Sequence, residues 1–183
     1  MPNAIDPPLR LIEVPTIRPG RLLITICPGK KGSGLAGRSH NRDLQTDVDT
    51  LVEAGVNVVC SLLTREEMDL LEVPDLGSAI QERGITWHHF PMPDGGVPDC
   101  DLDGWMARIG LLDESLRQGL NVVVHCRGGC GRAGLAAGSL LIKQGASDIE
   151  ALAAVRAVRP CAIETRDQEA LLRCLSMHVG RRT

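Results

Sequence analysis

The sequence predicts an α/β fold, with a single domain and a central, mostly parallel sheet of about five strands flanked by helices. Three observations support this prediction. Short apolar runs rich in β-branched residues alternate with longer segments of helical periodicity, which is the pattern of strand–helix–strand units in a parallel sheet. The length of 183 residues suits one domain with one core. The composition, 43% hydrophobic and 23% charged, is that of an ordinary soluble globular protein.

Two short strands are expected near the N-terminus, at residues 9–17 and 21–26, on either side of a turn at residues 19–20. Residues 27–40 are expected to form a surface loop rich in glycine and lysine, without the G-x-x-x-x-G-K-[ST] spacing of a nucleotide-binding loop. Four basic side chains lie in this loop or just after it: Lys30, Lys31, Arg38 and Arg42. Two roles remain open for them, a solvated basic surface and the edge of a substrate entrance.

After residue 40, strands and helices alternate along the chain. Strands are expected at residues 56–62, 85–90 and 121–124. Helices are expected at residues 43–54, 75–83, 101–118, 132–144, 147–158 and 165–180, with a short one after residue 64. Asn41 or Asp43 can cap the first of these helices. Two further starts carry the spacing of a capping box: Thr64 with Glu67, and Ser147 with Glu150.

The most informative segment is residues 125–134, with the sequence HCRGGCGRAG between an expected buried strand and an expected helix. Backbone N–H groups at a helix N-terminus lack intrahelical partners and carry partial positive charge, so a turn of such groups binds a tetrahedral oxyanion. Its glycines let the backbone approach the anion closely. We therefore expect phosphate binding by residues 126–132, called here the Cys126 loop. The residues assigned to this binding are Arg127, Gly128, Gly129, Cys130, Gly131 and Arg132.

The same loop supplies a nucleophile. A thiolate is stabilised at a helix N-terminus and beside arginine, so Cys126 is expected to attack phosphorus. Arg132 can hold two phosphate oxygens with its planar fork of donors. His125 is expected to hydrogen-bond the loop or the thiolate instead of transferring a proton. The alternative is a glycine-rich turn with a buried structural cysteine, although the strand, glycines, arginine and helix together favour a catalytic loop.

The Cys126 loop resembles the signature of the cysteine-dependent protein phosphatases, the tyrosine and dual-specificity group. Residues 90–99, FPMPDGGVPD, resemble the general-acid loop of that group and are most similar to that of the kinase-associated phosphatase family. Other similar segments extend the resemblance from about residue 40 to 175: residues 41–47, 85–89 and 162–168. The resemblance implies a dual-specificity phosphatase-like fold, with N-terminal strands and the basic loop in residues 1–40 and a catalytic core in residues 41–180.

In that resemblance, Asp94 is the general acid that protonates the leaving group, on a proline- and glycine-rich loop able to close over substrate. Residues 90–99 are called here the Asp94 loop. From the residues alone, Pro93-Asp94-Gly95 is equally compatible with a plain turn. Asp99 is a second candidate acid and also suits the N-cap of the next helix. Gln168 matches the glutamine that lies near the attacking water, and Glu164 stands where the large tyrosine phosphatases carry a second glutamine.

Two positions of the Cys126 loop and its helix depart from the group. Ala133 replaces a serine or threonine whose hydroxyl stabilises the departing thiolate, so slow breakdown of the phosphocysteine and burst kinetics are expected. Cys130 lies inside the loop, where it either fills space or forms a disulfide with Cys126 on oxidation. The seven cysteines are an odd, scattered set, which predicts reduced thiols.

These features predict a phosphoprotein phosphatase that hydrolyses phosphotyrosine, phosphothreonine or phosphoserine through a phosphocysteine, with no metal or cofactor. The chain has no tyrosine to wall a deep pocket of the tyrosine-specific type, which favours a shallower pocket. Arg127 hints at an alternative, a phosphoinositide or small phosphate-ester phosphatase. Ala133 motivates another, a phosphate-binding pseudophosphatase module.

Charge and hydropathy argue against a nucleic-acid partner and against a membrane-spanning segment. The net charge of −3 gives no general attraction to nucleic acid, and no apolar run is long enough to span a membrane. The N-terminus lacks a signal-peptide pattern. We therefore expect a cytoplasmic protein with a phosphoprotein partner, and its oligomeric state is left open.

Overall fold

The computed structural model describes residues 6–33 and 39–181, which form one domain around a five-stranded sheet of order β1-β2-β7-β5-β6. The strands of this sheet are β1 (Ile12–Val14), β2 (Leu22–Ile26), β5 (Val58–Ser61), β6 (Thr86–His89) and β7 (Val122–Cys126). β1 runs antiparallel to β2, and the other three pairings are parallel. The predicted α/β fold with a mostly parallel sheet is confirmed.

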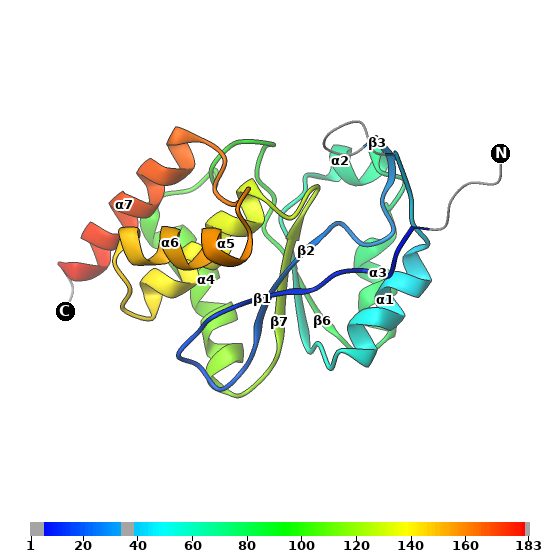
Figure 1. Ribbon diagram of the computed structural model, residues 1–183, viewed down its shortest axis with the longest axis horizontal. Helices are drawn as coiled ribbons and strands as arrows, with labels where there is room; N and C mark the ends of the chain where they lie inside the picture. The colour runs from blue at the N-terminus through cyan, green and yellow to red at the C-terminus, as the bar shows by residue number, and fades with distance from the viewer. Residues whose placement is uncertain (1–5, 34–38, 182–183) are drawn as a thin grey trace.

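Helices cover both faces of the sheet, with α4 to α7 on one side and α1 and α3 on the other (Figure 1). Their bounds are α1 (Leu44–Glu53), α2 (Arg65–Leu70), α3 (Leu76–Glu82), α4 (Leu102–Arg117), α5 (Gly131–Lys143), α6 (Asp148–Val158) and α7 (Arg166–Gly180). Every predicted helix is present within a few residues of its expected bounds. Among the described residues, no helix has the length and apolar character needed to cross a membrane.

The sheet divides the core into two apolar clusters, because successive side chains of a strand point to opposite faces. In β7, Val122 and Val124 pack with the α4–α7 side, whereas Val123 packs with the α1–α3 side. β7 lies between β2 and β5, so both of its faces are covered and all five of its residues are buried. This explains why the strand is a continuous apolar run up to the Cys126 loop.

Capping residues set the helix starts. The Asp43 side chain accepts from the Thr46 amide at the start of α1, and the capping boxes predicted for α2 and α6 are both present. The expectation that Asp99 caps α4 is wrong, because Asp101 accepts from the Gly104 amide instead. The cap therefore falls on the acidic residue adjoining the first helical turn.

The basic region differs most from expectation. It contains a second, two-stranded sheet, β3 (Lys31–Ser33) paired antiparallel with β4 (Ser39–Asn41), where only a loop was predicted. Lys30 and Arg42 are buried, so a solvated surface is the wrong interpretation for them. Arg42 is buried because Asp47 pairs with it through two hydrogen bonds of 2.7 Å. The expectation for Arg38 lies outside the described residues.

Candidate active site

The Cys126 loop joins the carboxyl end of β7 to the N-terminus of α5. Parallel sheets of this kind place ligands at the carboxyl ends of their strands. Cys126 is the last residue of β7, and its side chain is largely buried, at 4% exposure. Gly129 turns the loop with a φ of 62°, and a side-chain carbon there would come within 2.6 Å of the Thr25 carbonyl oxygen. The strand, the glycine turn and the helix predicted around Cys126 are therefore all in place.

Arg132 lies in the first turn of α5 with its guanidinium buried. Nη1 and Nη2 donate to the two carboxylate oxygens of Glu67 over 2.5 and 2.7 Å, and Nη1 also donates to the Met92 carbonyl over 3.0 Å. Burial opposes the charge, but the hydrogen bonds and charge of Glu67 outweigh it and raise the pKa of Arg132. Glu67 was predicted only as part of the capping box of α2, which it also forms. Nothing in the sequence signals its second partner.

Asp94 meets Arg132 across the site. The Arg132 Nη2 donates to Asp94 Oδ1 over 2.9 Å, while the Asp94 side chain remains 64% exposed. The Asp94 loop is held from the other side by Thr165 and Gln168, whose side chains donate to the carbonyls of Gly95 and Gly96 over 3.1 and 3.0 Å. The structure thus places the Asp94 loop between Arg132 of the Cys126 loop and the segment 165–168, so three distant parts of the chain meet here.

Gln168 is fully buried in the first turn of α7, with its amide group between two backbone segments. Its Oε1 accepts from the Glu164 amide over 2.9 Å, and its Nε2 donates to Gly96. Glu164 in turn reaches the Cys126 loop, where its Oε2 accepts from the Gly131 amide over 3.1 Å. Both residues singled out from the resemblance therefore lie beside the predicted phosphate site.

His125 hydrogen-bonds Ser61 of the neighbouring strand β5, a partner that the sequence did not indicate. Its Nε2 lies 2.6 Å from the Ser61 hydroxyl, which also accepts from the Trp87 indole N–H over 2.8 Å. Burial lowers the pKa of His125 to about 4, so the ring is neutral at pH 7. Because the indole donates to Ser61, we assign the remaining hydrogen bond as Ser61 donating to Nε2. His125 thus supports β7 from within the sheet.

Cys130 forms a disulfide with Cys161, on the connection between α6 and α7. This overturns the prediction that all seven cysteines are reduced, and it replaces both roles considered for Cys130, space filling and pairing with Cys126. The physical reason is topological: the fold brings the segment after α6 beside the Cys126 loop, although the two cysteines are 31 residues apart. Arg159, just before Cys161, braces the same loop by donating to the carbonyls of Gly128 and Gly129 over 2.8 and 3.0 Å.

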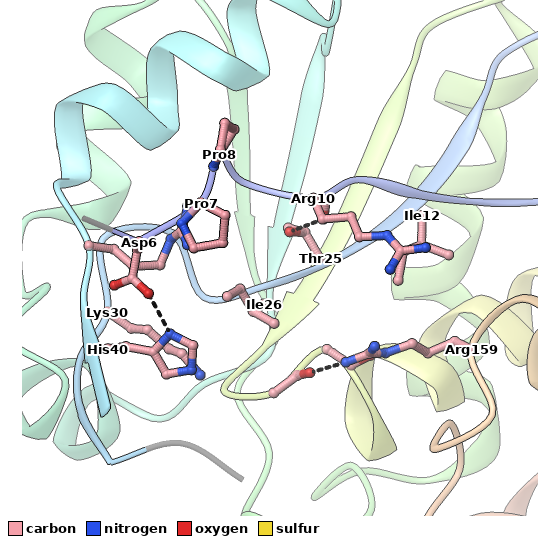
Figure 2. A pocket seen from close by; sticks show the side chains of 13 residues that line it. Asp6, Pro7, Pro8, Arg10, Ile12, Thr25, Ile26, Lys30, His40 and Arg159 are labelled. Carbon is pink, nitrogen blue, oxygen red and sulfur yellow. Dashed lines mark hydrogen bonds and ion pairs between the residues drawn. The ribbon is translucent and has the colours of Figure 1, made fainter. Parts of the chain in front are cut away.

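A cavity of about 600 Å³ lies beside the loop, and Gly128 and Gly129 form part of its wall. Figure 2 shows Lys30 and His40 on one side of it and Arg10 and Arg159 on the other, with Asp6 paired to His40. Lys30 Nζ donates to the Arg127 carbonyl over 3.1 Å, and burial lowers the pKa of this lysine. The sequence indicated basic character here, but it did not indicate that Arg10 and Arg159 come from distant segments to join it.

The chain is similar in sequence to known protein phosphatases and to one family model. The family model described as Cyclin-dependent kinase inhibitor 3 (CDKN3) matches residues 23–153. Cyclin-dependent kinase inhibitor 3 of Rattus norvegicus is 35% identical over 138 residues, which cover 74% of this chain and 64% of the rat protein. Protein tyrosine phosphatase domain-containing protein 1 of Mus musculus is 31% identical over 119 residues, covering 64% of this chain and 15% of the mouse protein.

Solved phosphatase structures also superpose on this chain. Kinase associated phosphatase, with serine in place of its catalytic-site cysteine, superposes with a TM-score of 0.84 at 26% identity, covering 96% of this chain and 98% of that chain. Tk-PTP in its active form gives 0.69 at 27% identity, covering 86% and 92%. The alignment spans just under two thirds of the length of the rat relative. The family model matches well over half of the residues, and so the chain belongs to the cyclin-dependent kinase inhibitor 3 family.

Proposed function

We propose that this protein is a cysteine-dependent phosphoprotein phosphatase, which hydrolyses phosphotyrosine, phosphothreonine or phosphoserine through a phosphocysteine. One observation carries the proposal: Cys126 and the buried guanidinium of Arg132 flank a glycine turn at a helix N-terminus, and Asp94 reaches that guanidinium. This set can bind a phosphate, attack it and protonate its leaving group. The kinase associated phosphatase, whose catalytic site holds a cysteine, supports the same assignment.

In the first step, backbone amides of the Cys126 loop and Arg132 bind the phosphate oxygens. The Cys126 sulfur attacks phosphorus, the bond to the leaving oxygen breaks, and Asp94 gives that oxygen a proton. Asp94 accepts a hydrogen bond from Nη2 of Arg132. A phosphate oxygen competes for that donor, so substrate binding releases the Asp94 carboxyl group toward the leaving oxygen. Glu67 keeps the guanidinium oriented meanwhile, because it pairs with both terminal nitrogens.

In the second step, water attacks the phosphocysteine and the Cys126 thiolate leaves. Ala133, fully buried in α5, offers no hydroxyl to the departing sulfur. The stabilisation left to the thiolate comes from the helix N-terminus and Arg132. We therefore place the slow step of turnover here, and expect the enzyme to accumulate as phosphocysteine.

The cavity beside the loop bears on the choice of substrate. Its basic side chains adjoin the phosphate site through Gly128 and Gly129, which favours substrates with a second anionic group close to the phosphate. A phosphoprotein segment with acidic neighbours has this character, and so does the alternative substrate, a phosphoinositide. We favour the phosphoprotein because a kinase associated phosphatase superposes on this chain with a TM-score of 0.84. Hydrolysis rates on matched phosphotyrosine, phosphothreonine and inositol phosphate substrates separate these alternatives.

The test of the proposed function is hydrolysis of an aryl phosphate by the wild type and by Cys126→Ser. We expect the variant to lose activity by at least about 10³-fold, because a serine hydroxyl is a far weaker nucleophile. Cys100→Ser is the matched control, since Cys100 is an exposed free thiol, and its activity should equal that of the wild type. A wild type that binds phosphate without hydrolysing the ester would identify the chain as a pseudophosphatase module.

A further inference from the structure

Glu164 places a carboxylate against the Cys126 loop. Its Oε2 accepts from the amide of Gly131, the first residue of α5 and the neighbour of Arg132. A side-chain carbon on Gly131 would overlap this oxygen and would lie 3.1 and 3.2 Å from the two polar atoms of the Gln168 amide. The carboxylate and the amide therefore both stand at the helix start to which we assign phosphate binding.

The backbone before Glu164 is strained. Ile163 has a φ of 58°, a left-handed conformation that is unfavourable for a β-branched residue. Such strain persists only where surrounding contacts enforce it, and it is concentrated at functional sites. Here Ile163 is fully buried, and Arg156 donates to the carbonyls of Ala162 and Ile163 over 3.1 and 2.7 Å. The surrounding contacts therefore hold Ile163, the residue before Glu164, in an unfavourable conformation.

Gln168 connects this carboxylate to the Asp94 loop. Its Oε1 accepts from the Glu164 backbone N–H, and its Nε2 donates to the Gly96 carbonyl. Glu164 is therefore tied through one side chain to the loop that carries the proposed acid, while its own carboxylate contacts the loop that carries the nucleophile. A residue in this position can touch a molecule bound between the two loops.

A carboxylate at an anion site repels phosphate, so its placement calls for a role other than phosphate binding. We propose that Glu164 is the general base for the water that hydrolyses the phosphocysteine, an inference that rests on the function proposed above. The contact found for the Glu164 carboxylate among the described residues is a neutral backbone amide. That contact leaves an oxygen with lone pairs to accept a proton from water.

The water oxygen forms a bond to phosphorus while the phosphorus–sulfur bond breaks, and the bonding electron pair goes to Cys126, which leaves as a thiolate. The proton lost by the water goes to the Glu164 carboxylate. Inorganic phosphate then departs, and the carboxyl group returns its proton to solvent. No metal, oxidant or reductant takes part.

The experiment follows the phosphocysteine directly. The wild type, Glu164→Gln and Glu164→Ala are mixed with an aryl phosphate, and both the released phenol and the acid-quenched phosphoenzyme are measured over time. We expect the rate of phosphoenzyme formation to stay within about twofold in both variants, while its decay slows by about 100-fold. The phosphoenzyme of both variants therefore persists longer than that of the wild type. Formate should restore part of the decay rate in Glu164→Ala but not in Glu164→Gln, whose amide fills the site.

Asp167→Asn is the matched control, because it removes an exposed carboxylate from the first turn of α7, three residues after Glu164, and its decay rate should equal that of the wild type. Decay within twofold of the wild type in Glu164→Gln would overturn the proposal. So would faster turnover with tighter phosphate inhibition, which would identify Glu164 as a plug that competes with phosphate. If no phosphoenzyme forms in the wild type, the proposed function itself fails, and this outcome differs from both.

Discussion

At the scale of single residues, the site depends on how Arg132 is held. A guanidinium on a flexible side chain binds phosphate well only when its plane is already oriented. Glu67 supplies this orientation by accepting from both Nη1 and Nη2, and the Met92 carbonyl adds a third acceptor. Glu67 is thus a positioning residue for Arg132, and its carboxylate offsets the cost of burying the positive charge.

We predict that Glu67→Gln lowers kcat/KM by about 10–100-fold, because the guanidinium loses one of its two oriented acceptors. Leaving the buried charge incompletely paired should also cost about 2 kcal/mol of unfolding free energy. Steady-state kinetics and urea unfolding measure the two effects. Glu66→Gln is the control, since Glu66 is an exposed carboxylate next to it in α2. Equal activity of the two variants would contradict the positioning role.

At the scale of elements, the turn between β7 and α5 decides whether the amides can surround an anion. Gly129 has a positive φ and faces the Thr25 carbonyl in β2, so both its conformation and its lack of a side chain are required. Gly119, which precedes β7, also has a positive φ but faces open space. A side chain at Gly129 would meet both backbone strain and a steric clash, whereas a side chain at Gly119 would meet backbone strain alone.

We predict that Gly129→Ala destabilises the protein by about 2–3 kcal/mol and weakens phosphate binding by at least about tenfold, because the loop must move away from β2. Gly119→Ala should cost about 1 kcal/mol and leave phosphate binding unchanged. Thermal unfolding and inhibition by inorganic phosphate give the comparison. If Gly129→Ala is inhibited by phosphate as strongly as the wild type, the Cys126 loop binds phosphate even after moving away from β2, and the prediction is wrong.

At the scale of the whole molecule, the Cys130–Cys161 disulfide ties the Cys126 loop to the connection between α6 and α7. That connection also carries Arg159, which braces the loop, and Glu164, which contacts Gly131. The expected cytoplasmic location rested on the N-terminal sequence pattern and on reduced thiols; the disulfide removes the second of these supports, and the location stays a prediction. The crosslink closes a loop of 31 residues in the unfolded chain.

We predict that Cys161→Ser lowers the unfolding free energy by about 3 kcal/mol, since closing a loop of this length restricts the unfolded chain by about that amount. A dithiol reductant should bring the wild type down to the level of the variant and leave the variant unchanged. Urea unfolding with and without reductant measures both. Cys100→Ser, which removes an exposed free thiol, should unfold like the wild type. A reductant-insensitive wild type would show that the crosslink contributes nothing to stability.

The sequence by itself determined the order and nature of the elements in the main sheet, because hydrophobic periodicity and capping pairs such as Thr64 with Glu67 are local. It also determined the Cys126 loop, since the nucleophile, the glycines and the arginine are contiguous in the chain. Only the tertiary structure decided which distant groups meet that loop: Glu67 on Arg132, Arg159 on the glycine carbonyls, Cys161 on Cys130 and Glu164 on Gly131. The physical reason is that these contacts depend on how the helices pack around β7, and helix packing brings together segments that share no local sequence pattern.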